Sequence, residues 1–251
     1  MRHAEFRHHR LVQVYDAECR WGPDDDFFRA VVDETPAARV LDLGCGTGRL
    51  TVALAAAGHT VTGVDPAGAS VAAARAKPGG EWVTWLEGTS ALLPERAFDV
   101  AVLASHVAQF FVDDAEWART LADLARTLVP GGRLVFDARD PADRRWERWN
   151  PVDSYRLVAL PDGGEVRAWT EVTGVRDAVV DFTHHYHFDD GEELLSSASL
   201  RFRTEVELRT SLTRAGFIVD RVHGGWRGEP VGHGDGEFVV VARVGTLAPV
   251  F

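Results

Sequence analysis

The sequence has little cysteine and no long apolar run. Cys19 and Cys45 are the only two cysteines, so we predict no structural disulfide, as in proteins of a reducing cytosol. No stretch approaches the roughly 18 apolar residues that cross a membrane. Residues 1–10 carry basic side chains without the apolar segment of a signal peptide. We therefore expect a cytoplasmic protein without a membrane partner.

Basic residues are also too few to balance the acidic ones. Lys and Arg number 27 against 38 Asp and Glu, and the net charge is −11. Because affinity for nucleic acids depends largely on cationic contacts to phosphate, this charge argues against a nucleic-acid partner. An apolar content of 45% over 251 residues is enough for one good-sized domain, or for one domain with an insertion.

Residues 40–50 read VLDLGCGTGRL, and the rest of the chain is organised around them. Their apolar start predicts a buried strand, and the apolar spacing after the turn predicts a helix. Gly44, Gly46 and Gly48 separate the two and let backbone N–H groups approach a ligand closely. The helix N-terminus that follows offers partial positive charge to an anionic group. Asp42 precedes the turn, so the segment predicts a ligand site.

Two classes of cofactor bind such a turn. The dinucleotide fingerprint G-x-G-x-x-G would require glycine where this chain has Arg49. The form D-L-G-C-G-T-G instead resembles motif I of the class I S-adenosylmethionine-dependent methyltransferases. The resemblance covers roughly residues 10–137 and 205–244, and it implies S-adenosyl-L-methionine as the cofactor. On this basis we expect the cofactor to contact Tyr15, Asp42, Gly44, Cys45, Gly46, Gly48, Asp65, Pro66, Thr89, Ser90 and Ser105.

Asp65 ends the second predicted strand, 17 positions after Gly48. A carboxylate at that strand tip can accept hydrogen bonds from both ribose hydroxyls; the alternative is a plain helix N-cap. Pro66 would then lie beside the adenine. The family often has aspartate where this chain has Thr89, whose hydroxyl can still accept a hydrogen bond from the adenine amino group.

Two residues are candidates for a catalytic role. Tyr15 and Asp16 match a Tyr-Asp pair that the family shows near its N-terminal segment. The Tyr15 hydroxyl would lie near the methyl group or the cofactor carboxylate, unless Tyr15 is a half-buried packing residue. His106 follows the apolar strand 98–104, whose carboxyl end should face the ligand crevice. An acid–base role suits this histidine; the alternatives are stacking on the cofactor or holding the loop.

The order of elements predicts an α/β fold with a Rossmann-like, doubly wound, mostly parallel seven-stranded sheet. Residues 1–38 would form an N-terminal helical cap, and residues 39–139 and 204–251 the cofactor-binding core. Residues 140–203 are rich in Thr, Val and aromatic residues and predict antiparallel strands. The resemblance implies that this β insertion serves as a lid or as the surface of a homodimer.

One strand of the insertion contains His184-His185-Tyr186-His187. Alternation along a strand puts His185 and His187 on one face, and His184 and Tyr186 on the other. Two histidines without an evident third ligand do not make a metal site, so we predict no metal. Contact with a substrate and packing within the sheet both remain open for these histidines.

The function implied is transfer of a methyl group to a nitrogen or oxygen of a small molecule. The sulfonium is already reactive, so the protein mainly aligns the acceptor and excludes water. Two alternatives stay open. One is a catalytically inactive protein that binds S-adenosylmethionine or S-adenosylhomocysteine. The other is a nicotinamide-dependent oxidoreductase, against which Arg49 argues.

Overall fold

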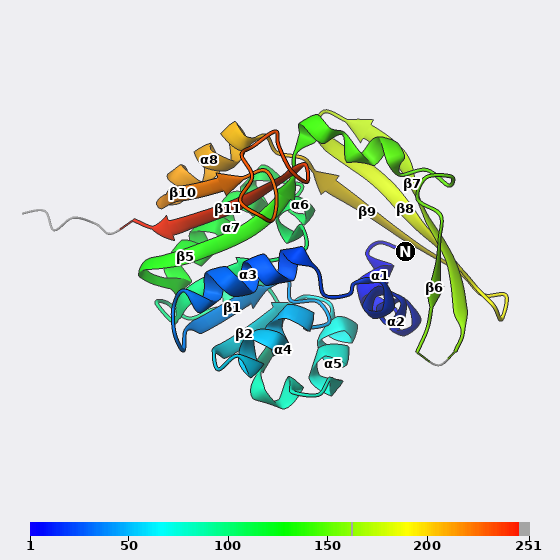
Figure 1. The fold of residues 1–251 in the computed structure, drawn as a ribbon, viewed down its shortest axis with the longest axis horizontal. Helices are drawn as coiled ribbons and strands as arrows, with labels where there is room; N and C mark the ends of the chain where they lie inside the picture. Colours follow the sequence, from blue (N-terminus) through cyan, green and yellow to red (C-terminus); the bar gives the residue numbers. More distant parts are fainter. Residues whose placement is uncertain (162, 246–251) are drawn as a thin grey trace, which may run out of the picture.

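The computed structural model describes residues 1–161 and 163–245, and it contains two separate β-sheets (Figure 1). Residues 161–164 (Pro-Asp-Gly-Gly) predict a turn of the insertion, and residue 162 of that turn lies outside the described residues. Residues 246–251 of the predicted core segment also lie outside them. The helices are α1 (Ala4–Arg7), α2 (His9–Glu18), α3 (Pro23–Asp33), α4 (Arg49–Ala56), α5 (Gly68–Ala76), α6 (Val107–Phe110), α7 (Asp114–Thr127) and α8 (Glu205–Arg214). The strands are β1 (Arg39–Leu43), β2 (Thr60–Asp65), β3 (Thr84–Glu87), β4 (Phe98–Leu103), β5 (Leu128–Arg139), β6 (Arg156–Ala159), β7 (Glu165–Arg176), β8 (Val179–Phe188), β9 (Glu193–Arg201), β10 (Phe217–His223) and β11 (Glu237–Val244).

The larger sheet has seven strands in the order β10-β11-β5-β4-β1-β2-β3. Strands β5, β4, β1, β2 and β3 pair in parallel, and β11 runs antiparallel to both of its neighbours. The strand order reverses between β1 and β4, and ligands of doubly wound sheets bind at the carboxyl ends of the strands beside such a reversal. The predicted fold class is confirmed.

Helices cover both faces of this sheet. Alternate residues of each strand point to opposite faces, so Leu41 and Ala101 pack with buried residues of α7 and α8. Val40 and Val100 pack on the other face, against Phe28 of α3 and apolar residues of α4 and α5. The central strand β4 is apolar throughout its buried part because both of its faces are covered.

The smaller sheet has four antiparallel strands in the order β6-β7-β8-β9, and the chain enters it after β5 and leaves it before α8. Its inner face presents Ala168 and Tyr186 to Leu11 and Val14 of the N-terminal helices. Figure 1 shows α1 and α2 between this sheet and the larger one. On the core side, Ser70 Oγ of α5 donates a hydrogen bond to the carbonyl of Phe6 (2.8 Å).

Several element boundaries differ from the prediction. The apolar spacing of residues 1–38 predicts a pair of short helices, but the segment holds three, because His8 has extended backbone angles between α1 and α2. The apolar and aromatic run 82–87 predicts the third strand, which begins only at Thr84, because residues 80–82 form a 3₁₀ turn. The amphipathic pattern predicts a helix over residues 117–128, but α7 already begins at Asp114, since the Asp113 side chain caps it by accepting the Glu116 N–H (2.8 Å).

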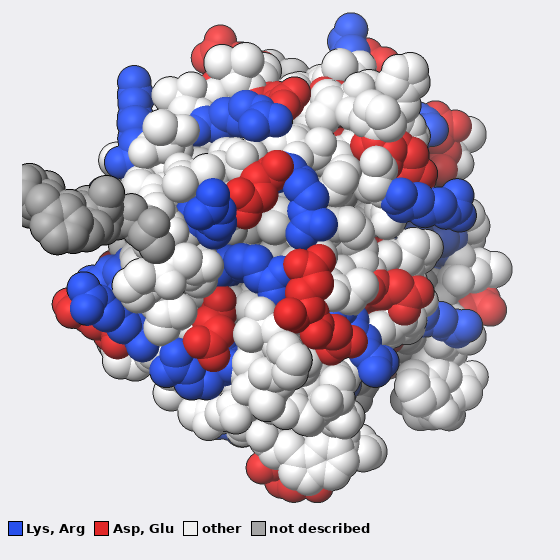
Figure 2. Space-filling view, turned by 60° about the vertical axis from the view of Figure 1, so that its left-hand side comes forward, with Lys and Arg blue, Asp and Glu red and all other residues white. Residues whose placement is uncertain are grey.

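The surface carries charges of both signs. On the face drawn in Figure 2, Lys and Arg lie interspersed with Asp and Glu. The net charge of −11 therefore does not gather into one acidic patch on that face. In the described part of the chain, no helix has the length and apolar character that a membrane span requires.

Candidate functional site

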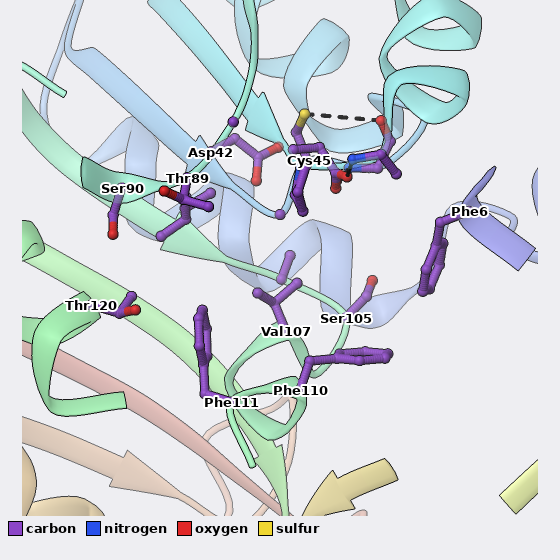
Figure 3. Close-up of a pocket in the computed structure, with 18 of the residues that line it drawn as sticks. Phe6, Asp42, Cys45, Thr89, Ser90, Ser105, Val107, Phe110, Phe111 and Thr120 are labelled. Carbon is purple, nitrogen blue, oxygen red and sulfur yellow. Dashed lines mark hydrogen bonds between the residues drawn. The ribbon is translucent and has the colours of Figure 1, made fainter. Parts of the chain in front are cut away.

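A cavity of about 540 Å³ opens at the carboxyl ends of β1, β2 and β4. Figure 3 shows residues from the glycine turn, the ends of these strands and α6 around it. All but one of the predicted cofactor contacts line it: Tyr15, Asp42, Gly44, Cys45, Gly46, Asp65, Pro66, Thr89, Ser90 and Ser105. The exception, Gly48, lies against a separate, smaller depression. The sequence therefore predicted which segments meet at this edge of the sheet.

The three glycines of the turn have different physical roles. All have positive φ, between 53° and 80°, which glycine adopts at no steric cost. A Cβ on Gly44 would lie 2.6 Å from a methyl carbon of Val107, and a Cβ on Gly48 would lie 2.5 Å from the Trp85 ring. A Cβ on Gly46 would meet nothing within 4 Å. Gly44 and Gly48 therefore allow close packing, whereas Gly46 leaves open space beside the cavity.

The Asp65 carboxylate lines the cavity and is hydrogen-bonded to the backbone on both sides of it. Its Oδ2 accepts the N–H of Gly46 (2.9 Å) and its Oδ1 accepts the N–H of Ala67 (2.8 Å). Burial raises the pKa of Asp65, and these two backbone hydrogen bonds oppose that rise. Each oxygen keeps a further lone pair for a ribose hydroxyl. The alternative role as N-cap is wrong, because Ala67 occupies the N-cap of α5, which has no side-chain cap.

The surroundings of the Asp42 carboxylate indicate whether the charged groups of the cofactor fit this cavity. Thr51 Oγ1 donates a hydrogen bond to Asp42 Oδ2 (2.6 Å), whereas Oδ1 is buried and has no hydrogen-bond partner among the described residues. Burial, with smaller contributions from neighbouring carboxylates, raises the pKa of Asp42 to about 7. A buried, unpartnered carboxylate oxygen on a cavity wall fits a cationic ligand group. S-adenosylmethionine carries two such groups, an ammonium and a sulfonium.

One end of the cavity is polar and is the predicted adenine end. Thr89 and Ser90 lie there opposite Thr120 of α7 (Figure 3). The Ser90 hydroxyl donates to Asp123 Oδ2 (2.8 Å). This bond uses the hydrogen of Ser90, so the hydroxyl keeps only its acceptor capacity for an adenine amino group. The contact of Thr89 with adenine stays a prediction.

The opposite end is aromatic. The Phe6 ring lies edge to face with Tyr15 (centroids 5.4 Å apart) and with Phe110 (5.7 Å). His3 packs edge-on against Phe110 at 5.7 Å. Burial raises the pKa of the Tyr15 phenol, so Tyr15 presents a neutral hydroxyl. Burial, together with Arg2 and Arg7, lowers the pKa of His3.

Three residues that line the cavity were not among the predicted site residues: His3, Phe6 and Phe110. The sequence does contain an indication that Phe110 could belong to the site, because Phe110 and Phe111 follow shortly after the carboxyl end of β4. His3 and Phe6 carry no such local signal. They reach the cavity only because the N-terminal segment binds the smaller sheet, where His3 N–H donates to the carbonyl of Ser197 (2.9 Å).

His106 is not among the described residues that line the cavity. Its Nε2 lies 3.0 Å from Glu237 Oε2 and 3.1 Å from Asp137 Oδ2, on the side away from the glycine turn. The side chain is therefore not placed to take a proton from an acceptor in this cavity. Of the roles predicted for His106, holding the loop is the one that this geometry favours.

The histidine run of the insertion follows the predicted alternation. Trp169 stacks against His185 (centroids 4.8 Å apart, planes 10° apart), and His187 lies 4.7 Å from the same ring. On the inner face, His184 Nδ1 lies 2.7 Å from Thr170 Oγ1. Burial lowers the pKa of His184 to about 3. These contacts describe packing within the sheet.

The fold and the site together define a Rossmann-like enzyme that binds an adenosyl cofactor. A family model described as a methyltransferase domain matches residues 40–132. The cypemycin N-terminal methyltransferase of a Streptomyces species is 30% identical over 216 residues, which cover 80% of this chain and 81% of that protein. An uncharacterized methyltransferase of Mycobacterium tuberculosis is 32% identical over 182 residues, covering 69% of this chain and 70% of that protein.

Solved structures agree on the fold. The CcbJ methyltransferase from Streptomyces caelestis superposes with a TM-score of 0.73 at 23% identity, covering 94% of this chain and 96% of that one. A methyltransferase from Clostridium acetobutylicum gives a TM-score of 0.75 at 17% identity, covering 94% and 98%. The chain belongs to the class I S-adenosylmethionine-dependent methyltransferase family. It is a methyltransferase whose cofactor is S-adenosyl-L-methionine, which excludes the predicted nicotinamide alternative.

Proposed function

We propose that this methyltransferase transfers its methyl group to an amine nitrogen of a small molecule. The observation that carries the proposal is the composition of the aromatic end of the cavity, which Phe6, Tyr15 and Phe110 enclose. The carboxylates of the described lining lie elsewhere. Asp42 and Asp65 are beside the glycine turn, and Glu116 and Asp123 belong to α7 near the adenine end.

An amine suits this end of the cavity because a neutral amine already carries the lone pair that attacks carbon. When bound, S-adenosylmethionine would supply the electrophilic methyl group, and its sulfur would keep the electron pair of the C–S bond that breaks. A hydroxyl acceptor would have to lose its proton during the attack, which calls for a base in line with it. His106 is turned away from the cavity. The geometry therefore favours nitrogen.

The aromatic rings contribute in two further ways. Their faces attract cations, so they favour both the positive charge before transfer and the methylammonium formed after it. The half-buried Tyr15 ring and the phenylalanines also exclude water from the acceptor. The relative from Streptomyces is named for methyl transfer at an N-terminus, and an amine acceptor in this chain is consistent with that likeness.

We further propose that the N-terminal cap (residues 1–38) and the β insertion (140–203) close the cavity over a cofactor-binding core formed by residues 39–139 and 204–251. Support comes from residues 3–6, at the start of the N-terminal segment, which are hydrogen-bonded both to the β insertion and to the core. His3 N–H donates to the carbonyl of Ser197 in β9 (2.9 Å), and the Phe6 carbonyl accepts from Ser70 Oγ in α5 (2.8 Å). A homodimer through the outer face of the insertion remains the alternative role predicted for it.

A matched panel of acceptors tests the choice of nitrogen. The full chain is incubated with S-adenosylmethionine and, separately, with a short peptide that has a free N-terminus, an amino sugar, and the N-acetylated form of each. Formation of S-adenosylhomocysteine and the mass of each acceptor are measured. We expect a mass gain of one methyl group on a free amine and none on the acetylated form. Methylation of the acetylated compounds at a hydroxyl would show that oxygen is the acceptor.

A variant at the aromatic end of the cavity tests whether the acceptor binds there. Phe6→Leu removes a ring from the cavity wall and keeps an apolar side chain. We expect slower transfer to the amine with little change in cofactor affinity. Phe27→Leu is the matched control. Phe27 belongs to α3, packs against His223 and Trp226, and does not line the cavity. Equal activities of the two variants would contradict an acceptor site at Phe6.

A further inference from the structure

We infer that His106 is a positioning residue of the cofactor site: Asp137 and Glu237 hold it, and it in turn holds Val107 over Gly44. The inference concerns cofactor binding, so it does not depend on the nature of the acceptor. His106 lies in the turn between β4 and α6, whereas Asp137 belongs to β5 and Glu237 opens β11. Three segments distant in sequence therefore meet at one side chain.

The contacts of His106 are with buried groups. Its backbone N–H donates to both carboxylate oxygens of Asp137 (3.0 and 3.1 Å), and its Nε2 faces Glu237 Oε2 at 3.0 Å. Asp137 is completely buried and Glu237 is 2% exposed. Hydrogen bonds to buried charged groups are stronger than those at a surface, and losing one leaves its partner unsatisfied.

The backbone at this turn is one that side chains rarely adopt. Ser105 has φ 59° and His106 has φ 64°, two consecutive residues in the left-handed region without glycine. Such backbone conformations are strained and persist only where the surroundings fix them. The bonds from Asp137 and Glu237 to His106 supply that fixation.

The left-handed turn at Ser105 and His106 determines the position of the next residue, Val107. Val107 points its γ-methyl groups at the glycine turn, and a Cβ on Gly44 would lie 2.6 and 2.7 Å from them. Ser105 and Val107 both line the cavity, as Figure 3 shows. The left-handed turn at His106 thus places one residue on either side of it against the cofactor site.

The same three groups are also of the types that bind metals, since a histidine nitrogen and two carboxylates offer atoms within 4.8 Å of one another. Positive charge is already present there. Arg145 Nη1 bonds to the other oxygen of Glu237 (3.0 Å), and the buried Arg139 guanidinium interacts with both carboxylates. We therefore assign the cluster to ion pairing and positioning rather than to a cation site.

Affinity for S-adenosylhomocysteine, measured by isothermal titration with the full chain, tests the inference. His106→Ala removes the Nε2 contacts with Glu237 and Asp137, and we expect affinity to fall about 10-fold or more, which is about 1.4 kcal/mol. His106→Asn keeps a residue type that tolerates the left-handed region but is too short for Glu237, so it should recover part of the affinity. The exposed His233 gives the matched control: His233→Asn should bind as the unaltered chain does.

A double-mutant cycle separates positioning from general destabilisation. Val107→Ala should weaken binding by itself, and adding His106→Ala should weaken it little further, because both changes act through the same contact. Three results would overturn the inference: unchanged affinity in His106→Ala, fully additive losses in the cycle, or a stoichiometric metal in the purified chain that His106→Ala loses. If His106→Ala does not fold by circular dichroism, the cycle is run with His106→Asn and judged by the same results.

Discussion

Asp65 connects the glycine turn to the start of α5 through one carboxylate. Oδ2 accepts the N–H of Gly46 (2.9 Å), and Oδ1 accepts the N–H of Ala67 (2.8 Å). These bonds use one lone pair of each oxygen, and Asp65 also lines the cavity. The same residue therefore shapes the turn and remains available to the ribose hydroxyls of the cofactor.

Replacing Asp65 by asparagine should disturb both roles. The amide keeps the shape of the side chain, but one of its two polar atoms becomes a donor and faces a backbone N–H. We expect affinity for S-adenosylhomocysteine to fall about 10- to 100-fold, which corresponds to the loss of one or two charge-assisted hydrogen bonds. Isothermal titration measures the change. Asp220→Asn, on the far strand β10 beside Arg243, is the control and should leave affinity unaltered. An equal affinity in Asp65→Asn would refute the ribose contact.

Asp42 predicts how cofactor affinity depends on pH. Its pKa is raised to about 7 in the absence of ligand, mainly by burial. A nearby ligand cation favours the ionised form, so binding releases the proton wherever Asp42 is still protonated. Affinity for S-adenosylhomocysteine should therefore fall as pH decreases from 8 to 6, by up to about tenfold per pH unit below 7.

Titrations at pH 6, 7 and 8 measure this dependence. Asp42→Asn removes the titrating group, so its affinity should be lower at pH 8 and nearly flat across the range. The Asp220→Asn control should keep the slope of the unaltered chain. A slope that survives in Asp42→Asn would assign the pH dependence to another group.

Much of the fold and part of the site were predictable because their signals are local. The glycine turn has its strand and helix on either side, and Asp65 comes at the end of the next strand. Parallel strands bring their carboxyl ends to one edge, so these residues meet whatever the detail of their packing. The resemblance to the methyltransferase family predicted that Thr89 and Ser90 belong to the same site, and both line the cavity.

Tertiary contacts decided what the sequence could not predict. His106 stands at the expected strand end, but its direction depends on Asp137 and Glu237, which follow it by 31 and 131 positions. Phe6 reaches the cavity because α1 is bound to β9 and α5. Nothing in the periodicity of residues 1–10 indicates such partners.

The packing of Val107 on Gly44 makes the first glycine of the turn sensitive to substitution. Gly44→Ala would combine a φ of +80° with a contact of 2.6 Å, so we expect a loss of more than about 2 kcal/mol in unfolding free energy and loss of cofactor binding. Gly131 in β5 is the matched control. It has φ +77° and open space around its Cβ position, so Gly131→Ala should cost only about 1–2 kcal/mol and leave binding intact.

Urea denaturation and isothermal titration measure the two effects. Adding Val107→Ala to Gly44→Ala should restore part of the stability, because it removes the methyl groups that the new Cβ meets. Equal losses in Gly44→Ala and Gly131→Ala would show that backbone strain alone, and not Val107, sets the requirement for glycine.

The buried carboxyl group of Glu5 should make the folded chain less stable as pH rises. The side chain is 5% exposed, its Oε2 has no hydrogen-bond partner among the described residues, and burial raises its pKa from 4.5 to about 7. Between these two values the folded chain holds a proton that the unfolded chain has released. The unfolding free energy attributable to Glu5 therefore falls as pH rises through this window, by up to about 3 kcal/mol at pH 8.

Glu5→Gln keeps the size of the side chain and removes its ionisation. We expect the variant to be more stable than the unaltered chain at pH 8, by up to about 3 kcal/mol, and to differ little at pH 5. Urea denaturation at the two pH values measures the difference, and the exposed Glu81 supplies the control, since Glu81→Gln should change stability little at either pH. If Glu5→Gln is less stable than the unaltered chain at both pH values, the prediction is wrong. The Glu5 carboxylate would then make a favourable contact in the folded chain, because replacing it would destabilise the chain at high pH only if the ion is paired or solvated there.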